Sequence, residues 1–190
     1  MIALHLTLAS ASPRRLELLG RLGIAPDAVA PADIDETPRH QELPKEYAAR
    51  MGREKAEAID APGFVLAGDT VVACGRRILP KTETEEEARA CLKLMSGRRH
   101  TVLSSIALRA PDGTIRERLS ENVVRFKNLS AQEIDAYIAS DEWRGKAGGY
   151  AIQGSAEALI RWMRGSHSSV MGLPLYETRA LLKSAGFAIG

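Results

Sequence analysis

Cysteine is scarce in this chain of 190 residues, with Cys74 and Cys91 the only two. They lack the C-x-x-C spacing of zinc and redox sites, so neither kind of site is indicated. Both lie among apolar residues, and we expect both to be ordinary core residues because free cysteine is among the most buried residue types.

Long apolar runs are also missing. No stretch approaches about 18 consecutive apolar residues, which excludes a membrane-spanning helix. We also expect no membrane partner. The opening MIALHLTLAS has no basic region and only a short apolar stretch, so it predicts a first strand and not a signal peptide. The cytoplasm is therefore the expected compartment.

A charge excess of one sign is absent as well. Lys and Arg number 26 against 24 Asp and Glu, a net charge of +2, which argues against a nucleic-acid partner and requires any basic site to be local. Hydrophobic residues make up 45% and charged residues 26%, as in ordinary globular proteins. The length favours one α/β domain spanning residues 1–190.

Apolar periodicity and capping residues predict the order of elements. Thr84 followed by Glu87 is typical of a capping box, and Pro13 after Ser12 indicates another helix start, with Leu16 and Leu18 on its apolar face. Strands are expected at 3–9, 28–32, 64–74, 100–110, 114–126 and 159–163, and helices at 13–22, 44–59, 84–96, 130–139 and 174–185. Early alternation and late local pairing predict a mixed sheet with helices on its faces.

Arg14 and Arg15 fall in the first turn of a predicted helix. That end of a helix already carries positive partial charge and prefers anions. Together with Ser10 and the small-residue loop, it would form a cradle for phosphate oxygens. The ordinary alternative is two solvated arginines on a surface helix.

Asp69 interrupts an apolar strand, where an unpaired carboxylate would be costly to bury. It needs a partner, and it could bind a hard cation such as Mg²⁺ or deprotonate water. The alternative is a strand irregularity in which Asp69 bonds nearby backbone amides.

Other charged residues could join this site. Asp33, Asp35 and Glu36 form an acidic loop that could meet Asp69 around a metal, although such loops are usually just solvated. Lys55 and Lys81 could each reach a polyphosphate. A phosphate cradle beside a metal-binding carboxylate is what hydrolysis of a nucleotide polyphosphate requires. The residues alone identify neither the base nor the bond cleaved.

At these residues the sequence resembles the Maf family of nucleoside triphosphate pyrophosphatases, once described as septum-formation inhibitors. The resemblance covers nearly the whole chain, with motifs at 8–19, 53–56, 67–72, 96–100, 146–154 and 172–175 in family order. One departure is that Pro80 precedes Lys81, whereas the family has proline after the lysine.

The resemblance implies an elongated α/β fold like that of inosine triphosphate pyrophosphatases, with a cleft between two lobes. It also implies dependence on a divalent cation (Mg²⁺ or Mn²⁺) and a homodimer. By resemblance, Asp69 is the catalytic proton acceptor and a metal ligand, Glu36 is the other metal-site acid, and the polyphosphate-binding residues are Ser10, Arg14, Arg15, Lys55 and Lys81.

The positions of Arg14, Thr70 and Gln153 match the branch of the family that acts on dTTP, UTP and related pyrimidine nucleotides. The amide of Gln153 offers a donor and an acceptor to the edge of a uracil or thymine ring. Its alternative role is to bond backbone in a glycine-flanked bend.

Two other functions use the same features. A non-catalytic regulator of cell division would bind nucleotides without hydrolysing them, whereas a nucleotidyltransferase would need an acceptor substrate. The full acidic and basic set favours hydrolysis of the triphosphate to the monophosphate and pyrophosphate.

Overall fold

The computed structural model describes residues 4–190, and its internal contacts divide the chain into two compact units. Unit 1 comprises the chain up to Asp69, Ser104–Ser120 and Gly172–Gly190, and unit 2 comprises Thr70–Leu103 and Glu121–Met171. The boundary between them falls directly after Asp69. That the chain forms a single domain stays a prediction.

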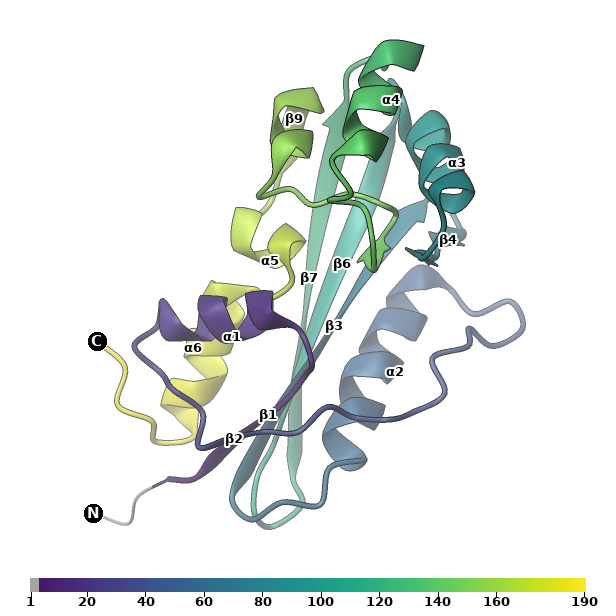
Figure 1. Ribbon diagram of the computed structural model, residues 1–190. Coiled ribbons are helices and arrows are strands. Elements are labelled where there is room, and N and C mark those ends of the chain that lie inside the picture. Colours follow the sequence, from purple (N-terminus) through teal and green to yellow (C-terminus); the bar gives the residue numbers. More distant parts are fainter. Residues whose placement is uncertain (1–3) are drawn as a thin grey trace. The chain divides into compact units, whose positions relative to one another are not determined.

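One mixed, seven-stranded sheet contains most of the strands (Figure 1). Its pairing order is β2-β1-β3-β6-β7-β9, with β4 on β3. Strand β1 is parallel to β2 and β3, whereas β4 is antiparallel to β3 and β9 is antiparallel to β7. The strands are β1 (Leu6–Ala9), β2 (Ala28–Val29), β3 (Phe64–Cys74), β4 (Arg77–Leu79), β6 (Arg99–Arg109), β7 (Ile115–Phe126) and β9 (Ile160–Arg164). The predicted mixed sheet with helices is confirmed.

Unit 1 contains helices α1 (Pro13–Gly20), α2 (Pro44–Glu57) and α6 (Leu175–Ser184). In Figure 1, α1 and α6 lie together on one side of β1 and β3, and α2 lies on the other. Ala56 of α2 packs with Ala9, Val65 and Ala67 in a cluster of small buried side chains. Small residues allow a helix to approach a sheet closely.

Helix α2 approaches β6 closely at Gly52. A β-carbon at this position would lie 2.7 Å from Oγ of Ser105 on β6, too close for any side chain to fit without a shift. The absence of a side chain at residue 52 therefore sets how near α2 lies to β6.

Unit 2 contains α3 (Glu85–Met95), α4 (Ala131–Ala139), the 3-10 helix η1 (Ser155–Leu159) and α5 (His167–Met171). A separate two-stranded sheet pairs β5 (Lys81–Thr82) with β8 (Lys146–Ala147). Gly148 follows β8 with φ +68°, and a β-carbon there would lie 2.9 Å from Val72. Only glycine meets both the backbone conformation and the close contact with β3.

Most predicted elements are present, with some corrections. Leu16, expected on the apolar face of α1, is 42% exposed, while Leu18 and Leu19 are buried. Cys91 is buried as predicted, whereas Cys74 is only half-buried. The strand expected at 28–32 has two residues, and residues 1–3 of the first predicted strand lie outside the described part.

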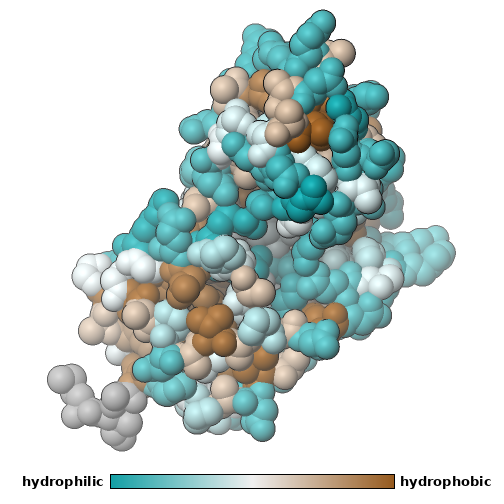
Figure 2. All heavy atoms as spheres, viewed as in Figure 1, coloured by the Kyte–Doolittle hydropathy of each residue, from teal (hydrophilic) through white to brown (hydrophobic). Residues whose placement is uncertain are grey.

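Hydrophobic atoms gather on the visible face of unit 1 around α1 and α6 (Figure 2). Within residues 4–190, none of the helices combines the length and the apolar character that crossing a membrane requires.

Candidate active site

Asp69 lies on the face of β3 that packs against α2. Because side chains alternate along a strand, Asp69 shares this face with Val65 and Ala67. It is 3% exposed. Lys55, next to Ala56 on α2, is 6% exposed and donates a hydrogen bond from Nζ to Asp69 Oδ1 over 2.6 Å. The partner that the buried carboxylate requires is therefore Lys55.

Lys55 also pairs with Glu36. Its Nζ lies 2.8 Å from Glu36 Oε1, so one buried ammonium contacts two carboxylates from distant parts of the sequence. Charged groups this well buried are tolerated when they are paired. The arrangement brings together three of the residues that the sequence predicted as functional.

The surroundings of Asp69 exclude one sequence alternative. Asp69 belongs to the strand predicted at 64–74 and its carboxylate bonds Lys55 Nζ, so the alternative of a strand irregularity in which Asp69 bonds nearby backbone amides is wrong. Of the acidic loop, only Glu36 reaches Lys55, since Asp33 and Asp35 are exposed. Hydrogen bonds from Thr37 lower the pKa of Asp35, whose Oδ1 accepts from the Thr37 amide at 2.9 Å.

Arg15, in the first turn of α1, contacts two other segments of unit 1. Its Nη1 donates to Ser10 Oγ over 3.0 Å, and its Nε donates to the Gly172 carbonyl over 2.9 Å. A β-carbon on Gly68 would lie 3.5 Å from this Nε, an ordinary van der Waals distance, so the guanidinium lies close to β3 at this residue. Burial lowers the pKa of Arg15, and the negative charges of Asp69 and Glu36 partly offset that effect.

Arg14 is half-buried, and burial lowers its pKa. It forms no hydrogen bond or ion pair with any other residue from 4 to 190. The N-cap Ser12 makes no side-chain capping bond, and the first turn of α1 contains no acidic residue. A partly buried cation at a helix N-terminus is best compensated by an anion, and the described part of the chain does not supply one.

Thr70, Lys81 and Gln153 belong to unit 2. Thr70 follows Asp69 on β3, and Lys81 is an exposed residue of β5 opposite Ala147 of β8. Gln153 is exposed, and its amide bonds none of residues 4–190, so the alternative role of bracing the local backbone is wrong. The bend instead closes through Gly154 N–H, which donates to the Ala151 carbonyl over 3.1 Å.

The carboxylates of Glu36 and Asp69, which meet at Lys55, are candidate ligands for a metal ion. The described residues hold no group of three or more His, Cys, Asp or Glu side chains suited to a metal. However, Glu36 and Asp69 each bring an oxygen within 3 Å of the same nitrogen atom, Lys55 Nζ. Mg²⁺ is commonly held by one or two carboxylates together with substrate phosphates and water, and this donor set fits that pattern.

Residues 5–185 match the family model described as Maf-like protein. The chain belongs to the Maf family.

Several curated relatives carry the name dTTP/UTP pyrophosphatase. The protein from Novosphingobium aromaticivorans is 62% identical over 188 residues, which cover 97% of this chain and 94% of the relative. The one from Zymomonas mobilis is 60% identical over 191 residues, covering 99% and 95%. The one from Caulobacter vibrioides is 58% identical over 185 residues, covering 96% of each chain.

Solved structures support the fold of this Maf protein. A HAM1 protein from Coxiella burnetii matches 96% of this chain and 100% of its own, with a TM-score of 0.52 at 19% identity. The Staphylococcus aureus Ham1 protein matches 95% and 99%, with a TM-score of 0.54 at 16% identity. At these identities the likeness concerns the fold alone.

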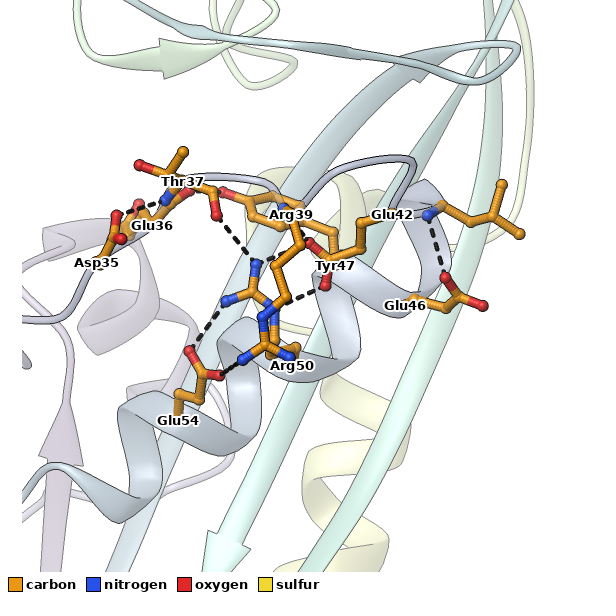
Figure 3. A network of polar contacts seen from close by, with 10 residues as sticks. Asp35, Glu36, Thr37, Arg39, Glu42, Glu46, Tyr47, Arg50 and Glu54 are labelled. Atoms are coloured by element: carbon orange, nitrogen blue, oxygen red, sulfur yellow. Dashed lines mark hydrogen bonds and ion pairs between the residues drawn. The ribbon is translucent and has the colours of Figure 1, made fainter.

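Figure 3 shows a polar network around Glu36 that the sequence did not single out. Arg50 contacts Glu42 and Glu54, and Tyr47 donates from its hydroxyl to the Glu36 carbonyl over 2.7 Å. Burial, and then the charges of Asp69 and Glu36, raise the pKa of Tyr47 to about 12, so the phenol stays a donor at neutral pH. The i,i+4 spacing of Arg50 and Glu54 could have indicated one of these pairs.

Proposed function

We propose that this Maf protein hydrolyses dTTP and UTP to the monophosphate and pyrophosphate. The observation that carries the proposal is the convergence of Asp69 and Glu36 on Lys55, in the unit that also holds Arg14 and Arg15. The names of relatives that are about 60% identical over nearly the whole chain support the same activity and substrates.

In the proposed reaction, Asp69 accepts a proton from a water molecule as the water oxygen attacks the α-phosphorus. The bond from the α-phosphorus to the oxygen that bridges to the β-phosphate breaks, and pyrophosphate leaves with that oxygen. A positioned carboxylate is a suitable general base because it can hold a water molecule by a hydrogen bond and accept its proton. The hydrogen bond that Lys55 Nζ donates to Asp69 Oδ1 over 2.6 Å fixes the orientation of this carboxylate.

Cationic side chains would hold the triphosphate. Arg14 has no anionic partner among residues 4–190, which suits it to a phosphate oxygen. Arg15 is oriented by Ser10 and Gly172, so its position is set in advance. Lys55 and Lys81 complete the proposed set, and their charges would stabilise the negative charge that develops as the bond breaks.

Glu36 and Asp69 would hold a divalent cation, Mg²⁺ or Mn²⁺. When bound, such an ion neutralises charge on the phosphate chain and lowers the pKa of water. The contribution of the chain is to keep the two carboxylates close together through Lys55.

Base selection would depend on Thr70 and Gln153 of unit 2. The exposed, unbonded amide of Gln153 is available to pair with the edge of a pyrimidine. An amide that donates and accepts side by side complements the adjacent carbonyl and N–H groups of uracil and thymine.

A nucleotide panel with product identification tests the activity. Purified protein is incubated with dTTP, UTP, CTP, GTP and ATP in Mg²⁺ and then in Mn²⁺, and the products are separated. Pyrophosphate and monophosphate from dTTP and UTP are expected. Diphosphate with orthophosphate would contradict the bond assignment, and tight binding without turnover would favour a nucleotide-sensing regulator.

The same proposal describes a cytoplasmic homodimer that acts on free nucleotides, with no nucleic-acid or membrane partner. The near balance of charge, 26 basic against 24 acidic residues, supports the lack of a nucleic-acid partner. Light scattering of the purified protein at several concentrations tests the dimer, for which a monomeric mass throughout would be the contrary result.

A further inference from the structure

The loop that carries Glu36 has little structure of its own. Between β2 and α2 the chain runs from Ala30 to Leu43 without a helix or strand. A loop of this length would sample many conformations unless side chains held it. Nevertheless, Glu36 Oε1 lies 2.8 Å from Lys55 Nζ.

Arg50 holds this loop by a fork of hydrogen bonds (Figure 3). Its Nε donates to Glu42 Oε1 over 2.6 Å and its Nη2 to Glu42 Oε2 over 2.7 Å. The same Nη2 donates to the Thr37 carbonyl over 3.1 Å. Arg50 therefore binds both the end of the loop and the residue directly after Glu36.

The fork is oriented and shielded by α2. Arg50 Nη1 donates to Glu54 one turn further along over 3.1 Å, and the guanidinium lies over the Tyr47 ring, 5.5 Å from its centroid. The side chains of Arg50 and Glu42 are only 12% and 8% exposed. Shielded, bidentate pairs contribute more than the exposed pairs of protein surfaces.

Tyr47 attaches the loop to α2 at Glu36 itself. Its hydroxyl bonds the Glu36 carbonyl, while Arg50 bonds the carbonyl of the next residue, Thr37. Two consecutive backbone carbonyls are thus fixed to α2, the helix that also carries Lys55.

We propose that Arg50 is a positioning residue that fixes the 30–43 loop on α2 and so keeps Glu36 beside Lys55 and Asp69. The consequence for metal binding rests on the proposed function. Arg50 itself does not touch the reacting groups in this role. Arg50 determines the fraction of time for which the Glu36 and Asp69 carboxylates lie close together.

The test compares Arg50→Met with Arg50→Lys and with Arg89→Met. Arg89 is a matched control because it also contacts two carboxylates, Glu85 and Asp135, but on α3 and α4 of unit 2. The first readout is hydrogen exchange of the 30–43 amides in protein free of nucleotide and metal. We expect faster exchange in Arg50→Met, a smaller increase in Arg50→Lys, and no change in Arg89→Met.

The second readout is the Mg²⁺ concentration that gives half-maximal hydrolysis of dTTP. In Arg50→Met this concentration should rise on the order of tenfold, as for other residues that orient a metal ligand. KM for dTTP at saturating Mg²⁺ should change little, which separates positioning from a general loss of structure.

The inference would be overturned if the 30–43 amides of Arg50→Met exchanged as slowly as those of the wild type. It would also be overturned if the variant required no more Mg²⁺ than the wild type. If Arg50→Met does not fold, Glu42→Gln supplies the same two measurements with the arginine and Glu54 left in place. A wild-type protein that hydrolyses no nucleotide would instead reject the proposed function, and the exchange rates would still decide whether Arg50 holds the loop.

Discussion

At the scale of single residues, the charged side chains of Lys55, Asp69 and Glu36 compensate one another. Lys55 is the common partner of Asp69 and Glu36, and both contacts are shorter than 3 Å. Sequence reasoning could show that Asp69 needed a partner, because a lone carboxylate in an apolar strand is costly. It could not select Lys55, since that pairing depends on how α2 packs against β3.

Replacing Asp69 by Asn keeps the shape of the side chain and removes its ability to accept a proton. We expect kcat for dTTP to fall roughly 10²- to 10⁴-fold, the usual contribution of a general base. Lys55 keeps Glu36 as a partner, so the variant should remain folded by circular dichroism. Asp112→Asn, in an exposed turn of the same unit, is the control. Normal turnover by Asp69→Asn would exclude Asp69 as the base.

At the scale of elements, the capping box of α3 offers a local test. The Glu87 amide donates to Thr84 Oγ1 over 3.3 Å, and the Glu87 carboxylate accepts from the Thr84 amide over 3.2 Å. Thr84→Ala should lower the free energy of unfolding by about 1 kcal/mol, measured by urea denaturation. Ser12→Ala, at an N-cap without a side-chain bond, should change it by less than about 0.5 kcal/mol. Equal losses in the two variants would contradict this view of the caps.

The contribution of the Arg50–Glu42 pair to stability should decrease at low pH. The hydrogen bond from Arg50 is the main cause that lowers the pKa of Glu42 from 4.5 to about 2. A carboxyl group whose pKa is lower in the folded state adds stability above its unfolded pKa and loses it as the pH falls toward its folded pKa. The difference in unfolding free energy between wild type and Glu42→Gln should thus be constant above pH 4.5 and shrink between pH 4.5 and about 2. A difference independent of pH across that window would be the contrary result.

Local signals predicted the long elements better than the short ones. Continuous apolar residues predicted β3 with its observed bounds, and the capping residues predicted α3 and α4 to within a residue or so. Strands β4, β5 and β8 span only two or three residues, too few for a period to be visible. Their positions depend on tertiary contacts, such as Gly148 against Val72.

At the scale of the whole molecule, the sequence predicted the class of fold but not the order of its strands. Alternating strands and helices indicated a mixed sheet, whereas the order β2-β1-β3-β6-β7-β9 depends on pairings between distant segments. The elongated outline, the cleft between lobes, the single domain and the homodimer stay predictions.

Ligand binding should stabilise the folded chain as a whole. An analogue of dTTP with a methylene between the α- and β-phosphates resists the proposed cleavage and should raise Tm in the presence of Mg²⁺. At 100 times its Kd it would add about 2.7 kcal/mol. Arg14→Met should show a smaller rise at the same concentration because a cation without a partner among residues 4–190 has been removed. Calorimetry of both proteins measures this, and an equal rise would remove Arg14 from the binding set.

The close approach at Gly52 has a consequence for how this protein tolerates change. Residue 52 lies one helical turn before Lys55, and Ser105 Oγ already fills the space where a methyl group would project. A β-carbon at residue 52 would also lie 3.1 Å from the Ser105 β-carbon, so alanine requires the Ser105 side chain or the helix to shift, and a shift of the helix would move Lys55. A position that carries no reactive group therefore constrains where α2, and with it Lys55, lies against the sheet.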